Sequence, residues 1–222
     1  MITATNEDCM DLLKRTPDNY YELSIVDPPY GINVNMNAGK KKGEKDRYSK
    51  KDWDKGIPNE EYFTELRRVS KNQIVWGCNY FDGLLWSSGR LSWFKNNGAA
   101  NDFSDCELAM HTFNNKVTNI SIKWSGFIKP ANEIGQKRIH PTQKPVKLYE
   151  WLLMNYAKEG DKILDTHRGS ASLDIACHNL GFDLVTCELD TDYFNDGNKR
   201  LKQHQQQQVM KFQLWHLKNK LN

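Results

Sequence analysis

The fold can be worked out from one stretch of the sequence, Leu23-Ser24-Ile25-Val26-Asp27-Pro28-Pro29-Tyr30. Its first four residues form a short, mainly apolar run, which predicts a buried strand. Pro28 and Pro29 lack a main-chain N–H, so the sheet ladder cannot continue past Asp27. The carboxylate of Asp27, rigid main-chain carbonyls and the ring of Tyr30 are therefore expected at the edge of a sheet. Such a cluster suits an amino group on a planar ring, although a strand that merely ends in a proline turn would have the same sequence.

The length and composition are those of a globular protein. The chain has 222 residues, enough for one large domain or two small ones, and its net charge of +3 is too small to indicate a nucleic-acid partner by itself. It has no apolar run of about 18 residues and no secretory signal at its start, so we expect a cytoplasmic protein without membrane contact. Five widely spaced cysteines without a C-x-x-C motif argue against disulfides, a structural zinc site or any other bound metal.

Strand and helix patterns alternate along the chain. Strands are expected over residues 2–5, 23–26, 73–76, 91–94, 106–111, 117–124, 162–164 and 184–187, and helices from Asp8, over 61–69 and 79–86, after Pro145, over 173–180, and from Thr191. This alternation predicts one α/β domain over residues 1–222 with a doubly wound, mostly parallel sheet. The strands between residues 91 and 124 are expected to form an antiparallel edge, and residues 203–222 a solvated helical or disordered tail.

A second candidate site follows the strand over residues 162–164. Asp165 ends that strand, the small-residue loop Gly169-Ser170-Ala171 leads into a helix, and Glu188 ends the next strand. Glycine in such a loop lets the backbone approach a nucleoside closely, and an acidic residue about 20 positions further on can bind ribose hydroxyls. The loop is neither G-x-G-x-x-G nor a phosphate-binding G-x-x-x-x-G-K-[ST] motif, so a nucleoside is favoured over a pyrophosphate ligand.

Residues 33–58 have little apolar periodicity and are rich in lysine. Seven basic residues fall within twelve positions, from Lys40 to Lys51, with only Glu44 and Asp46 opposing them. We interpret the segment as a mobile loop, which is either simply solvated or able to grip phosphates. The candidate DNA-binding residues in it are Lys40, Lys41, Lys42, Lys45 and Arg47.

Taken together, the motifs resemble a known family. Asp27-Pro28-Pro29-Tyr30, then residues 140–145 (His-Pro-Thr-Gln-Lys-Pro), then residues 164–170 (Leu-Asp-Thr-His-Arg-Gly-Ser) are similar to the β-class amino methyltransferases of DNA, in the order in which the catalytic half precedes the cofactor half. Residues 105–109 also resemble the family's middle strands. Short phage and prophage-type adenine methylases, with or without a restriction partner, are the most similar. The resemblance implies a circularly permuted Rossmann-like fold and S-adenosylmethionine as cofactor.

The resemblance also assigns roles to residues. Asp27 and the carbonyl of Pro28, in a turn held rigid by Pro29, would accept hydrogen bonds from the target amine, and Tyr30 would stack on a base turned out of double-stranded DNA. The cofactor would be bound by Asp8, Thr142, Lys144, Asp165, His167, Gly169, Ser170 and Glu188. Residues 95–139, together with the lysine loop, would recognise a short target sequence. Whether the protein is a monomer or a homodimer is left open.

The chemistry fits these residue types. The lone pair of an exocyclic amine is delocalised into its ring, and accepting its hydrogens localises that pair for in-line attack on the sulfonium methyl group, with proximity supplying much of the gain. As a family tendency, Asp at position 27 favours adenine N6 over cytosine N4. Arg168 and Ala171 depart from the family pattern, so a degenerate relative that binds without catalysis is an alternative. An RNA or protein amide methyltransferase is another, although glutamine-modifying enzymes more usually carry Asn in place of Asp27.

Overall fold

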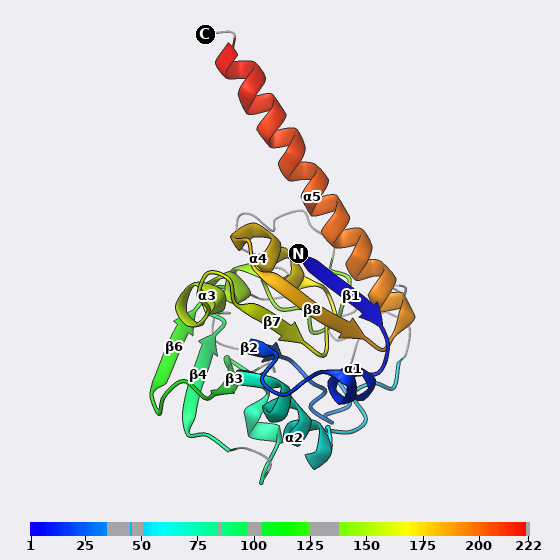
Figure 1. Ribbon diagram of the computed structural model, residues 1–222, viewed down its shortest axis with the longest axis vertical. Coiled ribbons are helices and arrows are strands. Elements are labelled where there is room, and N and C mark those ends of the chain that lie inside the picture. The colour runs from blue at the N-terminus through cyan, green and yellow to red at the C-terminus, as the bar shows by residue number, and fades with distance from the viewer. Residues whose placement is uncertain (35–44, 46–50, 84–85, 97–103, 125–137, 221–222) are drawn as a thin grey trace.

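The computed structural model describes residues 1–34, 45, 51–83, 86–96, 104–124 and 138–220, with side chains up to Met210 (Figure 1). The strands are β1 (Ile2–Asn6), β2 (Tyr21–Val26), β3 (Ser70–Trp76), β4 (Gly89–Phe94), β5 (Cys106–His111), β6 (Val117–Ser121), β7 (Lys162–Asp165) and β8 (Asp183–Glu188). The helices are α1 (Cys9–Arg15), α2 (Glu60–Val69), the short 3-10 helix η1 (Cys78–Tyr80), α3 (Val146–Tyr156), α4 (Ser172–Leu180) and α5 (Thr191–Lys220).

The strands form one sheet in the order β1-β8-β7-β2-β3-β5-β4-β6. The five strands from β1 to β3 are mutually parallel, so the carboxyl ends of β2, β7 and β8 meet at one edge. This arrangement confirms the doubly wound, mostly parallel sheet, and the strand β2 that precedes Asp27 lies directly beside the strand β7 that ends in Asp165. The two motifs are thereby brought together from opposite halves of the sequence.

The antiparallel pairing is centred on β5, inside the sheet, and does not include its outermost strand. Strand β5 runs antiparallel to β3 and to β4, whereas the outermost strand β6 is parallel to β4. Strand β4 thus separates β5 from β6, which are neighbours in the sequence. Both β5 and β6 belong to the sheet, although they fall within the segment 95–139 that we assigned to target recognition; parts of that segment, residues 97–103 and 125–137, lie outside the described residues.

Helices cover both faces of the sheet. Residues of α1 and α2, such as Leu13 and Phe63, pack with Val26 and Val75 on one face, and residues of α3 and α4 pack with Ile25 and Ile163 on the other (Figure 1). The apolar spacing in α2 and α3 that predicted helices from sequence is the spacing that buries these faces. The sheet is therefore buried on both sides, as a mostly parallel sheet requires.

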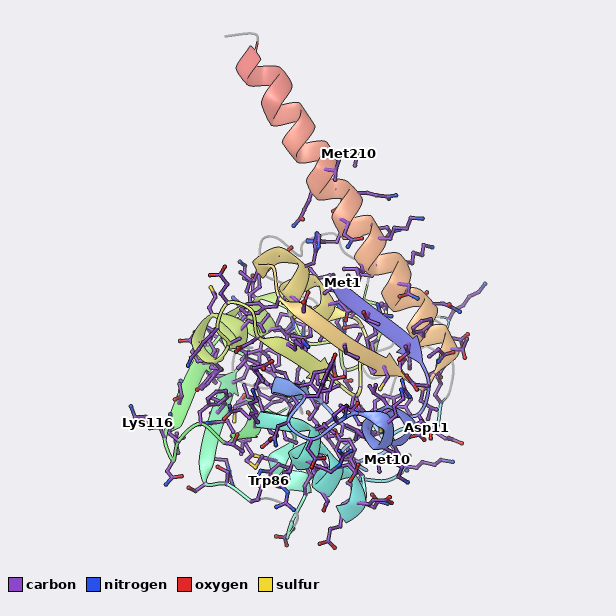
Figure 2. All side chains as sticks on the ribbon, in the orientation of Figure 1. Met1, Met10, Asp11, Trp86, Lys116 and Met210 are labelled. Carbon is purple, nitrogen blue, oxygen red and sulfur yellow. The ribbon has the colours of Figure 1, made fainter. Side chains whose placement is uncertain are left out.

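One predicted element differs from the structure. Of the helix expected over residues 79–86, the described part of the chain forms only the 3-10 turn η1, because the backbone is already non-helical at Phe81, with φ −111° and ψ 54°; residues 84–85 lie outside the described residues. The tail, for which the sequence left helix and disorder open, is a helical continuation of α5, which contacts β1, β8 and α4 and then extends beyond the sheet (Figure 1). Met210, labelled in Figure 2, lies on the extended part. No helix in the described part of the chain is both long enough and apolar enough to cross a membrane.

Candidate active site

Asp27 follows the last residue of β2, and each of its carboxylate oxygens accepts one hydrogen bond. The phenol O–H of Tyr30 donates to its Oδ1 at 2.5 Å, and the ammonium group of Lys144 donates to its Oδ2 at 2.5 Å. Pro28 is buried and Pro29 is partly exposed. The turn that they form is held at its two ends by the hydrogen bonds of Asp27 and Tyr30. An ionised carboxylate has about four lone-pair positions, so each oxygen of Asp27 can still accept a hydrogen bond from a substrate amine.

The ring of Tyr30 is held by aromatic neighbours. It stacks on Tyr80 with ring centroids 4.9 Å apart at 13°, and it meets the edge of Phe81 at 6.2 Å. Gly77 makes this position possible: it has φ +74°, and a Cβ built on it would lie 2.1 Å from the Tyr30 ring. One face of Tyr30 is thus covered by Tyr80, so a base stacked on Tyr30 would have to use the other face or displace Tyr80.

Lys144 joins Asp27 to a second carboxylate that sequence reasoning missed. Its ammonium group lies 3.1 Å from Oε2 of Glu107 on β5 and donates to the Tyr30 hydroxyl at 3.1 Å. The other oxygen of Glu107 pairs with Lys95 at 2.8 Å. The result is a row of alternating charges, Asp27, Lys144, Glu107 and Lys95. The available signal was Glu107 itself, an acidic residue in one of the stretches that carry the family resemblance.

The pKa values in this row reflect mutual compensation. Burial alone would lower the pKa of Lys144, but Asp27 and Glu107 together hold it above its ordinary value. Burial would likewise raise the pKa of Glu107, yet Lys144 and Lys95 lower it to about 2. Both groups therefore stay ionised across the physiological range. The side chain of Lys144 is only 3% exposed, so its charge is neutralised by partners rather than by water.

The cofactor motif has a different electrostatic character. Asp165 is buried at the end of β7, with Oδ1 accepting the main-chain N–H of His167 at 3.0 Å. At the end of β8, Glu188 accepts the N–H of Gly169 at 2.8 Å and that of Asp190 at 3.0 Å. Burial raises the pKa of both carboxyl groups, and main-chain N–H groups only partly oppose this rise. The charges of Asp174, Asp27 and Glu188 raise the pKa of Asp165 further.

Arg168, which departs from the family pattern, directs its guanidinium group to partners on α4 and α5. Its guanidinium group is fully buried and pairs with Asp174 of α4 at 2.8 Å. It also donates to the carbonyl of Phe194 at 3.2 Å and to Asn198 at 2.9 Å, both on α5. Arg168 therefore fastens α5 to α4, and its charge also lowers the pKa of Glu188, although burial outweighs this effect.

The remaining predicted cofactor residues occupy varied positions. Asp8 is exposed and caps α1 by accepting the N–H of Met10 at 2.8 Å, and the hydroxyl of Thr142 lies 3.0 Å from Nδ1 of His140. Burial lowers the pKa of His167 to about 4, so its ring is neutral near pH 7. The hydroxyl of Ser170 lies 3.0 Å from that of Ser172. The cofactor role of these residues stays a prediction.

The structure describes only one of the five candidate DNA-binding residues in the basic loop. Lys45 is exposed. Lys40, Lys41, Lys42 and Arg47 lie outside the described residues. Lys51, at the end of the loop, pairs with Asp190 at 2.6 Å and Asp192 at 2.8 Å at the start of α5. One lysine of the loop is thus engaged with the cofactor half of the protein.

Comparisons with known proteins agree with this arrangement. The family model described as DNA methylase matches residues 87–199, about half of the chain. The chain is 24% identical over 246 residues to the type II methyltransferase M.HinfI of Haemophilus influenzae, covering 90% of this chain and 68% of that protein. It is 23% identical over 249 residues to M2.LlaDCHI of Lactococcus lactis subsp. cremoris, covering 87% of each.

Solved structures give the same fold. The complex of M1.HpyAVI with SAM superimposes with a TM-score of 0.58 at 22% identity, covering 90% of this chain and 100% of that one. The cytosine-N4-specific PvuII DNA methyltransferase superimposes with a TM-score of 0.56 at 12% identity, covering 89% and 86%. The chain belongs to the DNA methylases, and within them to the β-class DNA amino methyltransferases. Its methyl donor is S-adenosylmethionine, and it is a site-specific DNA methyltransferase.

The residues at the acidic edge fit that cofactor. Asp165 and Glu188 supply carboxylate oxygens at the ends of adjacent strands, where a nucleoside's hydroxyl groups can donate. Raised pKa values indicate that these carboxylates are poorly compensated in the free protein, which suits a ligand that carries a sulfonium charge. Arg168, which would repel such a ligand, is turned into the α4–α5 contact.

Proposed function

We propose that this protein methylates the 6-amino group of adenine in double-stranded DNA. The observation that carries the proposal is the Asp27 carboxylate, fixed by Tyr30 and Lys144 at the end of β2, the strand beside β7, which ends in Asp165 of the cofactor motif. The base would be turned out of the duplex to reach this edge, at a cost of a few kcal/mol. S-adenosylmethionine, bound near Asp165 and Glu188, supplies the methyl group.

The role we assign to Asp27 is to accept a hydrogen bond from the target amine. The carbonyl of Pro28 would accept the second amine hydrogen, so the nitrogen lone pair would be released from the ring. Tyr30 would position the base, while its hydroxyl keeps the Asp27 carboxylate in one orientation. Preorganised acceptors of this kind favour the transition state because they need no reorganisation during the reaction.

The preference for adenine rests on Asp at position 27, as a tendency of the family. The test is to incubate the protein with labelled S-adenosylmethionine and unmethylated duplex DNA, digest the DNA to nucleosides and identify the product by mass spectrometry. We expect N6-methyldeoxyadenosine. N4-methyldeoxycytidine would overturn the choice of base, and label only in RNA or protein would overturn DNA as the substrate.

Asp27→Ala tests the assignment of the acceptor. We expect methyl transfer to fall by about 10³-fold, as for removal of one key stabilising group in other enzymes, while S-adenosylmethionine binding measured by calorimetry stays within a factor of about 3. The matched control is Asp11→Ala, which removes an exposed carboxylate from α1. Equal label from the Asp27→Ala variant and the original protein would remove Asp27 from the mechanism, and no turnover by either, despite cofactor binding, would identify a degenerate relative.

A further inference from the structure

One carboxylate outside the motifs, that of Asp54, accepts hydrogen bonds from main-chain N–H groups in the segment that begins at Tyr30. Oδ1 of Asp54 accepts the N–H of Tyr30 at 3.0 Å and the N–H of Gly31 at 3.0 Å. Oδ2 accepts the N–H of Val34 at 2.8 Å, and the Asp54 carbonyl accepts the N–H of Asn33 at 3.1 Å. Asp54 is only 4% exposed. A single buried residue thus satisfies four of the donors in the five residues from Tyr30.

The reason that these donors need such a partner lies in the sequence. Pro28 and Pro29 have no N–H, so the first main-chain donor after Asp27 is that of Tyr30. The segment has left the sheet ladder, and Gly31 and Asn33 adopt left-handed conformations with φ +69° and +56°. A backbone of this shape has no regular structure to hold it, so its position depends on the contacts that its polar groups find.

The segment that carries Asp54, residues 51–57, contacts other parts of the site. Trp53 packs against His140, with ring centroids 5.1 Å apart, and Lys51 pairs with Asp190 beside the cofactor motif. On the other side, Gly31 lies against Ile57, which a Cβ on Gly31 would approach to 3.1 Å. The segment 51–57 therefore connects the turn after Asp27 to the elements that follow β8 and precede α3.

We infer that Asp54 is a positioning residue for methyl transfer: its carboxylate fixes the backbone of Tyr30, and Tyr30 in turn fixes the Asp27 carboxylate through the 2.5 Å hydrogen bond from its hydroxyl. The inference rests on the proposed function of Asp27 and Tyr30. Asp54 acts through Tyr30 and touches no reacting atom. Because a displacement of about 1 Å at a reacting group can cost about 10²-fold in rate, a loosened turn should be visible in catalysis.

The experiment compares Asp54→Ala, Asp54→Asn and Asp27→Ala in single-turnover methylation of unmethylated duplex DNA, together with calorimetric binding of S-adenosylmethionine. Ala removes all three acceptor contacts of the side chain. Asn keeps one oxygen, which can still accept from Tyr30 and Gly31. We expect the methylation rate to fall by about 10²-fold in Asp54→Ala and by about 10-fold in Asp54→Asn, with cofactor affinity changed by less than about 3-fold in both.

The matched control is Asp52→Asn, two positions away, whose carboxylate is 65% exposed and pairs with Lys55 at 2.8 Å; its rate should stay within a factor of about 2. Rates within a factor of about 3 of the original in both Asp54 variants, with Asp27→Ala inactive, would overturn the positioning role alone. Full activity of Asp27→Ala would overturn the proposed function of Asp27. A parallel loss of cofactor binding and thermal stability in Asp54→Asn would show that Asp54 serves the fold and would also overturn the inference.

Discussion

The two halves of the site treat their carboxylates in opposite ways. At the end of β2, Asp27 faces the buried ammonium of Lys144, which is also shared with Glu107. At the ends of β7 and β8, Asp165 and Glu188 have main-chain N–H groups as hydrogen-bond donors and raised pKa values. In one half the protein compensates the carboxylate charge with a buried cation, whereas in the other burial disfavours the ionised form of the carboxyl groups.

This difference suits the ligand that we propose for each half. The target amine is neutral, so a compensated Asp27 can accept its hydrogens without an excess charge in the site. The methyl donor is a cation, so carboxylates that the fold leaves poorly compensated can gain from its arrival. The same parallel sheet thus places two kinds of acidic site at the ends of the neighbouring strands β2 and β7. Removing the charges one at a time tests this distinction.

The largest expected effect follows from Lys144→Met. The substitution leaves Asp27 and Glu107 close together without their shared cation, and breaking a buried ion pair by removing one partner costs about 3 kcal/mol or more. We therefore expect the melting temperature to fall by about 6–12 °C. Because the pKa of Lys144 is raised and that of Glu107 is lowered, this stability is present from above the ordinary carboxylate pKa up to the ordinary lysine pKa. The loss should therefore be the same at pH 6 and pH 8 (about 0.5 kcal/mol at most between them).

Lys71→Met is the matched control, because Lys71 of β3 is about half exposed and pairs at 3.1 Å with Glu22 of β2, which is itself partly exposed. It should cost less than about 1 kcal/mol. The double variant Lys144→Met with Glu107→Gln removes one of the two carboxylates that shared Lys144 and should recover part of the loss, although Glu107 also pairs with Lys95. Equal melting temperatures for the two single variants would contradict the description of this half as internally compensated.

A smaller effect of opposite sign is expected in the cofactor half from Asp165→Asn. The raised pKa of Asp165 means that the folded protein holds this proton more tightly than the unfolded chain. The stability that the group contributes is therefore complete below its ordinary pKa and is lost as the pH rises through the folded value. The neutral amide avoids this loss and can still accept the N–H of His167, so the free variant should melt a few degrees higher at pH 8, with the advantage vanishing near about pH 4.

The same substitution should weaken S-adenosylmethionine binding by about 10-fold, since a charge-assisted contact is replaced by a neutral one. Differential scanning fluorimetry across pH and calorimetry with the cofactor measure the two effects. Asp161→Asn, which alters a carboxylate just before the other end of β7, controls for the change in net charge. A variant that is both less stable at pH 8 and equally good at binding would show that Asp165 is not an uncompensated charge.

The sequence predicted these two halves unequally, for physical reasons. Apolar runs that end in Asp27, Asp165 and Glu188 identified three strand ends, and strand alternation placed them at one edge. The partners of those carboxylates depend on side chains from distant elements: Lys144 lies 117 residues from Asp27, and Asp54 reaches back to Tyr30 from 24 residues away. No local pattern encodes such contacts.

The antiparallel strand and the short helix show the same limit. The position of β5 between β3 and β4 is decided by pairing across the sheet and not by the alternation within the strand. The predicted helix over residues 79–86 had suitable apolar residues, but regular structure ends at Tyr80, because the backbone at Phe81 is non-helical. Arg168 could be recognised as a departure from the family, but its direction depends on Asp174 and α5. Tertiary contacts supplied what the local sequence lacked.

The smallest effects test whether the cofactor half is also strained in its backbone. Ala171 precedes α4 with φ +58°, a left-handed conformation that costs a non-glycine residue about 1–2 kcal/mol. Its methyl group is fully buried, however, and burying a methyl group contributes about 0.8 kcal/mol. Glycine would also increase the entropy of the unfolded chain. We therefore expect Ala171→Gly to change the free energy of unfolding by less than about 0.5 kcal/mol, as measured by urea denaturation.

Gly181, at the other end of the same helix, provides the comparison that makes this result informative. It is also left-handed, at φ +78°, but a Cβ built on it would meet nothing within 4 Å. Gly181→Ala gains no buried methyl contact and should cost about 1 kcal/mol. If Ala171→Gly stabilised the protein by that amount, backbone strain and not packing would dominate at the cofactor loop. A near-neutral result would show that the packing of the Ala171 methyl group offsets its backbone strain. The destabilisation in the cofactor half would then be assigned to its buried carboxyl groups.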